Sequence, residues 1–187
     1  MRYVGECNYS GWRHADADRA ALDRGWAPFV SSQNYYNIMR RQVELELLPY
    51  CTEHNIGFLP YFPLAGGWLT GKYTPGAETP ANARSMVGKL QGDDRAHAVL
   101  SQLDAFANEH GRSLLELAFA WLLAHPAVSS VIAGAMTPEQ VASNAAACDW
   151  ELTRDEREAV DAIAAWDGST EEIERFGMGN SPKYPDR

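Results

Sequence analysis

Cysteine and histidine are the residue types of this sequence that could bind a metal ion or carry redox chemistry. The chain has 3 cysteines and 5 histidines, namely Cys7, Cys51, Cys148, His14, His54, His97, His110 and His125. Zinc sites draw their ligands from short spacings such as CxxC or HxxxH, and none occurs in this sequence. The spacing therefore disfavours a metal site, and the scattered cysteines favour free thiols in a reducing compartment.

A small-residue stretch after an apolar run is a second feature that could serve chemistry. Residues 58–62 predict a buried strand, and they are followed by Pro63-Leu64-Ala65-Gly66-Gly67. Residues 70–92 then carry several glycines and prolines without hydrophobic periodicity. A loop of this length is uncommon as a simple connector and is usually functional or mobile. We therefore expect a functional loop after this strand.

The charge balance limits the classes of partner. The sequence has 16 Lys+Arg against 25 Asp+Glu, a formal net charge of −9, which argues against a nucleic acid or an anionic membrane surface as the main partner. A hydrophobic fraction of 45% is ordinary for a globular protein. Residues 1–6 are too few and too polar for a signal peptide, and no apolar segment is long enough to span a membrane. We expect a cytoplasmic protein.

The elements that must position these residues alternate between two patterns. Four short apolar runs predict β-strands, at residues 2–8, 26–33, 58–62 and 128–132. Amphipathic periodicity predicts helices at residues 10–25, 42–54, 93–110, 114–124, from 138 onward, and from 153 to about 165. Ser113 with Glu116, and Thr153 with Glu156, have the spacing of capping boxes. Such alternation is typical of parallel βα units.

Four βα units fit either a small open sheet or half of a (β/α)₈ barrel, because a complete barrel needs about 250 residues and eight strands. We place one domain at residues 1–166. Residues 167–187 are rich in glycine, proline and charge, and we expect them to form a flexible C-terminal tail.

Four blocks of sequence, in order and at natural spacing, resemble the aldo-keto reductase family over the chain to about residue 165. Residues 5–10 are similar to the GxSNxS end of the family's fifth barrel strand, and residues 61–73 are similar to its YSPLAGGxLTGKY loop. The other two blocks, at residues 32–49 and 131–144, resemble the sixth and eighth strands with their helices. The resemblance implies a partial (β/α)₈ TIM barrel of about four βα units plus a C-terminal helix, corresponding to strands five to eight.

The resemblance also implies a reaction, the NADPH-dependent reduction of aldehydes or ketones by hydride transfer. The family's catalytic Asp, Tyr, Lys and His lie near strands two, three and four, outside the part that this chain resembles. No residue here inherits a catalytic role, and Tyr35, Tyr36 and Lys72 in particular do not.

Residues for the cofactor NADP(H) do carry over. Asn8 and Gln33 would hold the nicotinamide carboxamide, because their side chains supply both a donor and an acceptor, and Tyr61 would stack on the nicotinamide ring. Backbone amides of a loop without bulky side chains would approach the pyrophosphate, at Pro63, Leu64, Ala65 and Gly66. Basic positions that grip phosphates in some relatives match Lys72 and Arg84. The positions that hold the adenosine and its 2′-phosphate match Gly134, Met136, Gln140 and Asn144.

The chain departs from the family pattern at several of these positions. Cys7 and Phe62 each stand where the family usually has Ser, and Ser143 stands where it usually has Glu. Met136 offers only its backbone to a phosphate. We therefore expect NADPH to bind more weakly than in complete relatives.

Three kinds of function remain open at this stage. The chain is the C-terminal fragment of an oxidoreductase, or a non-catalytic NADP(H)-binding or redox-sensing module, or a structural and interaction protein. Because hydride transfer needs a general acid, the oxidoreductase fragment would need a complementary N-terminal half, or a partner in a split enzyme, to supply one. Only the completed enzyme would act on a small-molecule carbonyl substrate. Open strand edges predict self-association in the absence of that half. We expect neither nucleic acid nor membrane as a partner.

Overall fold

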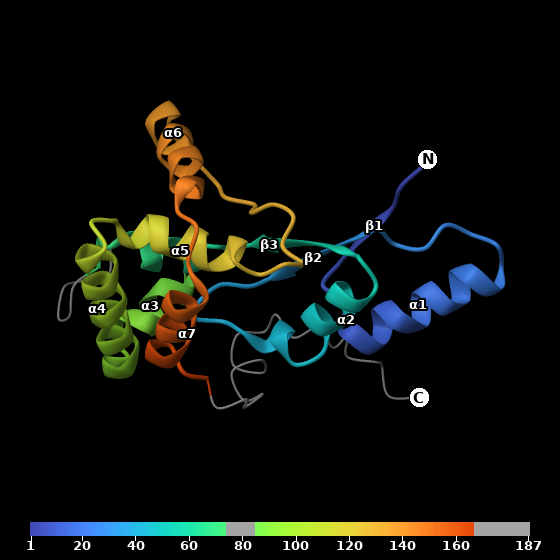
Figure 1. Ribbon diagram of the computed structural model, residues 1–187, viewed down its shortest axis with the longest axis horizontal. Coiled ribbons are helices and arrows are strands. Elements are labelled where there is room, and N and C mark those ends of the chain that lie inside the picture. Colours follow the sequence, from blue (N-terminus) through green and yellow to red (C-terminus); the bar gives the residue numbers. More distant parts are fainter. Residues whose placement is uncertain (74–84, 167–187) are drawn as a thin grey trace.

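Three parallel strands form the centre of the computed structural model, which describes residues 1–73 and 85–166 (Figure 1). The sheet has the order β1-β2-β3 and consists of β1 (Gly5–Cys7), β2 (Ser31–Tyr35) and β3 (Gly57–Tyr61). Helix α1 (Gly11–Asp23) connects β1 to β2, and α2 (Leu47–Glu53) lies in the connection from β2 to β3. The predicted βα alternation is confirmed here, with strands shorter or shifted relative to residues 2–8 and 26–33.

The predicted fourth strand lies beside β3 but is not a regular strand. Residues 128–132 pair with it in parallel only at Phe58–Val128 and at Tyr61–Ile132. Phe58 donates its N–H to the Ala127 carbonyl at 2.8 Å and accepts from the Ser129 N–H at 3.0 Å. The Pro60 carbonyl accepts from Ile132, but proline has no N–H to donate in return, so the ladder is interrupted there.

Within the described residues, one face of the sheet is buried and most of the other is not. Glu6, Ser32 and Phe58 lie on the buried face. The opposite face carries Gly5, Cys7, Gln33, Leu59 and Tyr61, none of which is buried, and Tyr35 at the end of β2, which is. Parallel sheets normally bury both faces, so this chain leaves open a face that a complete α/β protein would cover.

The C-terminal part of the described chain supplies most of the core. It contains α3 (Ser85–Gln91), α4 (Asp94–Glu109), α5 (Leu114–Leu123), α6 (Pro138–Ala146) and α7 (Arg154–Ile163). A 3₁₀ segment, η3 (Ala147–Asp149), follows α6, and two others lie earlier in the chain, η1 (Gln42–Glu44) before α2 and η2 (Ala65–Thr70) after β3. Helix α5 is buried along nearly its whole length, and Trp121 in its last turn is fully inaccessible. Both predicted capping boxes are confirmed, at Ser113 and at Thr153.

Two predicted segments were wrong in detail. The helix expected at residues 42–54 is divided into η1 and α2, with Leu45 exposed between them. Proline fits only the first turn of a helix, so Pro49 requires α2 to begin close before it. The irregular stretch expected at residues 70–92 contains α3, in which Val87 and the half-buried Leu90 form a short apolar repeat. Residues 74–84 and the predicted tail lie outside the described residues.

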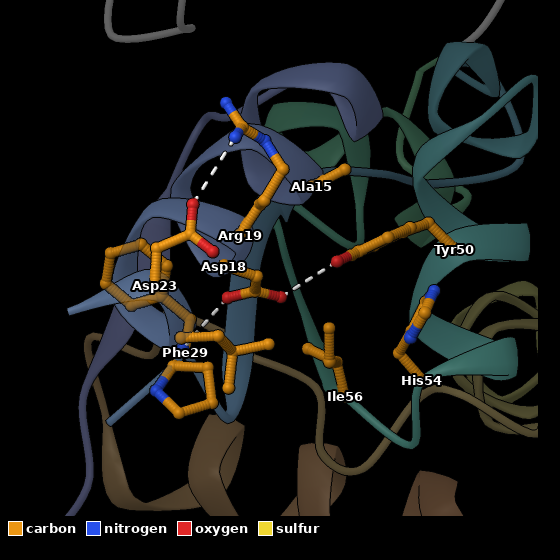
Figure 2. Close-up of a pocket in the computed structure, with 10 residues that line it drawn as sticks. Ala15, Asp18, Arg19, Asp23, Phe29, Tyr50, His54 and Ile56 are labelled. Atoms are coloured by element: carbon orange, nitrogen blue, oxygen red, sulfur yellow. Dashed lines mark hydrogen bonds and ion pairs between the residues drawn. The ribbon is translucent and has the colours of Figure 1, made fainter. Parts of the chain in front are cut away.

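A buried polar cluster joins β1 to α1 and α2. His14 is fully buried, with Nδ1 3.3 Å from a Glu6 carboxylate oxygen and Nε2 3.5 Å from an Asp18 oxygen. Glu6 also accepts a hydrogen bond from the Ser32 hydroxyl. The Tyr50 hydroxyl donates to Asp18 at 2.8 Å, across a groove of about 500 Å³ between the two helices (Figure 2). The imidazole therefore links carboxylates from a strand and a helix.

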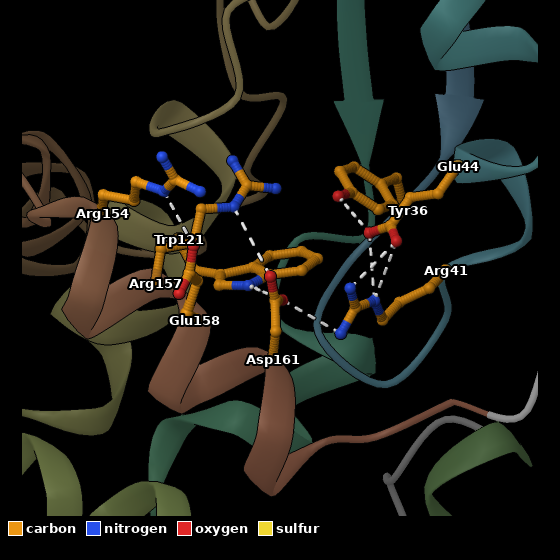
Figure 3. A network of polar contacts seen from close by, with 8 residues as sticks. All are labelled: Tyr36, Arg41, Glu44, Trp121, Arg154, Arg157, Glu158 and Asp161. Carbon is orange, nitrogen blue, oxygen red and sulfur yellow. Dashed lines mark hydrogen bonds and ion pairs between the residues drawn. The ribbon is translucent and has the colours of Figure 1, made fainter.

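A second polar network joins η1 to α5 and α7 (Figure 3). Arg41 pairs with Glu44 at 2.9 Å and with Asp161 at 3.0 Å. Asp161 also accepts from the Trp121 indole N–H at 2.9 Å, and Glu44 accepts from the Tyr36 hydroxyl at 2.6 Å. Burial, with Glu44 beside it, raises the pKa of Tyr36. These contacts fasten the segment after β2 to the C-terminal helices.

Helix α6 is the exception to this packing. The Thr137 side chain caps it by accepting from the Gln140 N–H, as expected, but none of its residues is buried. Figure 1 shows it projecting from the rest of the molecule beyond α5. No helix within residues 1–73 and 85–166 has the length and apolar character needed to cross a membrane.

Candidate cofactor site

The carboxyl ends of β1 and β3 bring Asn8 and Tyr61 together, and Gln33 lies in the middle of β2 between them. Asn8 directly follows β1, and its N–H donates to the Gln33 carbonyl at 3.0 Å. Tyr61 ends β3, and its hydroxyl donates to Asn8 Oδ1 at 2.8 Å. Three residues that are up to 53 positions apart in sequence thus form one group.

Asn8 has an unusual backbone conformation. Its φ of 63° lies in the left-handed region, which asparagine tolerates better than most residues. The Tyr9 N–H donates to the Glu6 carboxylate at 2.8 Å and closes the turn. This conformation places the Asn8 carboxamide within reach of Tyr61.

The Tyr61 ring lies against other aromatic side chains. It stacks on Tyr35 at 5.6 Å between centroids, with 14° between the planes, and Phe62 packs its ring edgewise at 5.5 Å. Partial burial, and then the nearby Cys7, raise the pKa of Tyr61 against smaller opposing effects of Arg40 and the Asn8 hydrogen bond. At neutral pH the phenol therefore keeps its proton and acts as a donor.

The loop after Tyr61 has a contorted backbone. Phe62 and Ala65 have φ of 55° and 48°, in the left-handed region that is unusual for residues other than glycine. Gly67 has φ of 106°, and the Gly67 N–H donates to the Leu64 carbonyl at 2.8 Å. The fully buried Trp68 anchors the far end of the loop. Pro63 is buried, whereas Leu64 and Gly66 are half-buried.

Lys72 brings a positive charge to this loop. Its side chain is exposed, and a Cβ atom added at Gly67 would lie 3.2 Å from Nζ. The ammonium group also lies 5.2 Å from the centroid of the Tyr73 ring. Arg84, the other expected phosphate ligand, lies outside the described residues.

The expected adenosine group lies around the start of α6. Gly134 and Met136 are exposed, and the Met136 N–H donates to Gln140 Oε1 at 2.7 Å. Asn144 is half-buried, and its carbonyl accepts from the Cys148 thiol at 3.6 Å. The structure thus unites the strand-end residues with the loop, whereas the adenosine group sits on the projecting helix.

Tyr35 and Arg40 are site residues that the sequence reasoning missed. Arg40 places its guanidinium carbon 4.5 Å from the centroid of the Tyr35 ring. The strand register pairs Tyr35 with Tyr61, and the alternation along β2 puts Tyr35 on the same face as Gln33. That alternation was the signal that could have identified Tyr35.

A sequence model of the Aldo/keto reductase family matches residues 1–165. The chain belongs to the aldo/keto reductase family. The fold of this family is a (β/α)₈ barrel, in which parallel neighbours follow one another in sequence order. Strands β1, β2 and β3, and then residues 128–132, follow the same order.

Several curated relatives share this region. The versiconal hemiacetal acetate reductase of Aspergillus parasiticus is 27% identical over 158 residues, 83% of this chain and 46% of the relative. A putative aryl-alcohol dehydrogenase of Schizosaccharomyces pombe is 32% identical over 66% of this chain and 38% of its own length. A probable voltage-gated potassium channel subunit beta of Arabidopsis thaliana is 40% identical over 65% of this chain and 39% of its own length. The chain spans about half the length, or less, of these relatives.

The residues present fit the nicotinamide end of the NADP(H) used generally by aldo/keto reductases. Asn8 is exposed and Gln33 half-buried, so their amides lie at the surface of the strand-end group. The half-buried Tyr61 offers a flat ring beside them, and the loop with Lys72 adds a cation. A ligand with a planar ring, an amide and an anionic group would match, in turn, the Tyr61 ring, the two amides and the Lys72 ammonium group.

Proposed function

We propose that this chain is the C-terminal, cofactor-binding half of an NADP(H)-dependent aldo/keto reductase. Bound NADPH supplies a hydride for the reduction of an aldehyde or ketone. The observation that carries the proposal is that Asn8 after β1 and Tyr61 at the end of β3 are hydrogen-bonded, with Gln33 of β2 bonded to the Asn8 backbone between them.

These residues would bind and orient the nicotinamide. Asn8 uses Oδ1 to accept from Tyr61, so its Nδ2 group is the part that can donate to the ligand's carboxamide. Gln33 offers a second amide from the neighbouring strand. The Tyr61 ring would stack on the nicotinamide, since aromatic faces favour offset stacking.

The remaining expected ligands would hold the rest of the cofactor. Lys72, beside the loop at residues 63–67, and Arg84 would neutralise phosphate charge. Gly134, Met136, Gln140 and Asn144 would hold the adenosine, with the positive N-terminal end of α6 nearby.

The chain's own residues would not complete the reaction. Carbonyl reduction needs a general acid, and the residues gathered at the site bind and orient the cofactor instead. We infer that a complementary N-terminal half supplies this acid and closes a partial barrel. The open face of the sheet and the share of the relatives that the chain covers support this inference.

A non-catalytic NADP(H)-binding module is the second candidate. This candidate is favoured because Asn8, Gln33 and Tyr61 suit cofactor binding and need no proton transfer for it. The two candidates differ in one result. Adding an N-terminal half from a relative restores aldehyde-dependent NADPH oxidation only if the chain is half of an enzyme.

Titration of the full chain with NADPH, followed by cofactor fluorescence, tests the binding that both candidates share. We expect saturable binding, with Tyr61→Leu weakening it about tenfold because the stacking surface is lost. Tyr3→Leu is the matched control, since Tyr3 is 75% exposed and lies before β1. Absence of saturation with the unaltered chain, or an equal effect of both substitutions, would refute the proposed site.

A further inference from the structure

Tyr61 packs against a neighbouring side chain that is almost entirely buried. Tyr35 is only 9% exposed, and its ring lies nearly parallel to that of Tyr61, 5.6 Å away between centroids. The two tyrosines are register partners in β2 and β3, so the backbone pairing itself sets their separation. Because Tyr35 occupies one face of the Tyr61 ring, a planar ligand can stack only on the other.

Arg40 extends this arrangement. It is 8% exposed, and its guanidinium carbon lies 4.5 Å from the centroid of the Tyr35 ring, within the range of a cation–π contact. Such a contact is stronger when the cation is removed from water, as it is here. The charge therefore restrains the Tyr35 ring, which in turn packs on Tyr61.

The turn that carries Arg40 is fastened to the end of β3. Asn37 and Arg40 exchange two backbone hydrogen bonds, at 3.2 and 2.9 Å, which close the turn. The Asn37 side-chain amide then donates to the Phe62 carbonyl at 2.8 Å. The turn after β2 and the residue after Tyr61 therefore keep a defined spacing.

Two further contacts limit the Tyr61 side chain. Its hydroxyl is bound to Asn8, and Phe62 packs edgewise against both tyrosine rings at 5.5 Å. A ring held at its face, its edge and its hydroxyl has lost most of its rotational freedom before any ligand arrives. Binding to such a ring costs less conformational entropy than binding to a mobile one.

We propose that Tyr35 and Arg40 are positioning residues that hold the Tyr61 ring in a binding-ready orientation and select the one face on which a planar ligand stacks. The identity of that ligand as nicotinamide rests on the function proposed above. The restraint itself is a property of this chain alone.

The test compares Tyr35→Leu with Tyr35→Phe, which keeps the ring and removes only the hydroxyl. Tyr35→Leu is expected to weaken NADPH binding about two- to tenfold, whereas Tyr35→Phe is expected to bind NADPH within about twofold of the unaltered chain. Arg40→Met, which keeps the stem and removes the charge, is expected to weaken binding about two- to threefold.

A second measurement needs no cofactor. Ring-flip rates of Tyr61, followed by NMR of chain with labelled tyrosine, are expected to rise in Tyr35→Leu and Arg40→Met and to stay near the original value in Tyr35→Phe. Unchanged flip rates in both Tyr35→Leu and Arg40→Met would overturn the proposal, as would equal binding losses in the Leu and Phe variants. If the unaltered chain binds no NADPH, the proposed function fails and the flip rates still decide the positioning role. If Tyr35→Leu does not fold, Arg40→Met decides it.

Discussion

Asn8 adopts a left-handed φ of 63° and also accepts a hydrogen bond from the Tyr61 hydroxyl. The backbone conformation costs a residue with a Cβ atom about 1 kcal/mol relative to glycine, and asparagine offsets this cost better than alanine. The two requirements can be separated, because glycine satisfies the first and only a side chain with an acceptor satisfies the second.

We expect Asn8→Ala to destabilise the chain by about 1–2 kcal/mol, because it loses the hydrogen bond and keeps the strained backbone. Asn8→Gly loses only the hydrogen bond and is expected to cost about 1 kcal/mol less than alanine. Urea unfolding of the two variants beside the unaltered chain measures both values. Equal stability of the Ala and Gly variants would show that the left-handed conformation carries no cost at this position.

The residues that could be predicted at this scale are those whose role follows from position at a strand end. Asn8 follows β1 and Tyr61 ends β3, and the structure joins them by a hydrogen bond. Tyr35 ends β2, but its contact with Tyr61 and with Arg40 does not follow from that position alone. The role of Tyr35 and Arg40 depends on the register between two strands and on a turn closed by Asn37, which are properties of pairing rather than of residue type.

At the scale of elements, His14 holds β1 and α1 together from a fully buried position. Its imidazole lies between carboxylates of Glu6 and Asp18, at 3.3 and 3.5 Å. Removing His14 leaves the buried Glu6 carboxylate with the Tyr9 N–H and the Ser32 hydroxyl as its remaining partners, and a buried polar group that loses a partner costs stability. The cost of removing His14 is therefore expected to come mainly from Glu6, the more deeply buried of the two carboxylates.

We expect His14→Leu to destabilise the chain by about 2–3 kcal/mol. The double variant Glu6→Gln/His14→Leu should lose less than the sum of the single losses, since it also removes the carboxylate that His14 contacts. A double-mutant cycle in denaturant measures this difference. Arg19→Leu is the control on the same helix, because the Arg19 ion pairs are largely exposed and their loss should change stability little. Additive losses in the cycle would exclude coupling between Glu6 and His14.

The capping box of α5 makes stability depend on pH. Hydrogen bonds from the backbone and side chain of Ser113, with Arg112 nearby, hold the pKa of Glu116 below its ordinary 4.5. A carboxyl with a lowered folded-state pKa contributes stability above its unfolded value, and that contribution is lost as the pH falls through the folded value.

As the pH falls below 5, we expect the free energy of unfolding to decrease more in the unaltered chain than in Glu116→Gln, because the glutamine amide does not titrate. Thermal melts across this range measure the two curves. Ser113→Ala removes the hydroxyl that donates to Glu116 but keeps the donating backbone N–H of residue 113, and it should reduce the dependence on pH in part. Parallel curves for the unaltered chain and Glu116→Gln would remove Glu116 from the acid response.

Periodicity and capping signals in the sequence predicted most helices and strands, but they did not predict where an element is interrupted. The caps at Ser113, Thr137 and Thr153 begin helices as predicted. One error is α3, a helix within a stretch expected to be irregular, and two others arise at prolines. Pro49 restricts where α2 can begin, and Pro60 lacks the N–H that a fourth strand would need.

At the scale of the whole molecule, the sheet has more unsatisfied surface than a parallel sheet normally has. Strand β1 pairs with β2 on one side only, and Cys7 on the open face is exposed. Several large apolar side chains are also exposed within the described residues. They include Tyr3, Trp12, Leu22, Trp26, Ile132 and Met136. An unpaired strand edge beside exposed apolar surface is a template for association.

We expect the purified chain to dimerise or form larger species unless a complementary N-terminal half is present, and sedimentation velocity across a range of concentrations measures this. The reaction rate of the Cys7 thiol with a disulfide reagent shows whether the open face is the surface that becomes covered. The pKa of Cys7 is raised by partial burial and by Glu6, so the thiol should react slowly even in the single chain. The reaction should become slower still as the chains associate. The exposed Cys148 on η3 is the control and should keep its rate. A monodisperse monomer with a sharp cooperative melt would contradict the expectation, because it would mean that the sheet is stable with one face open to water.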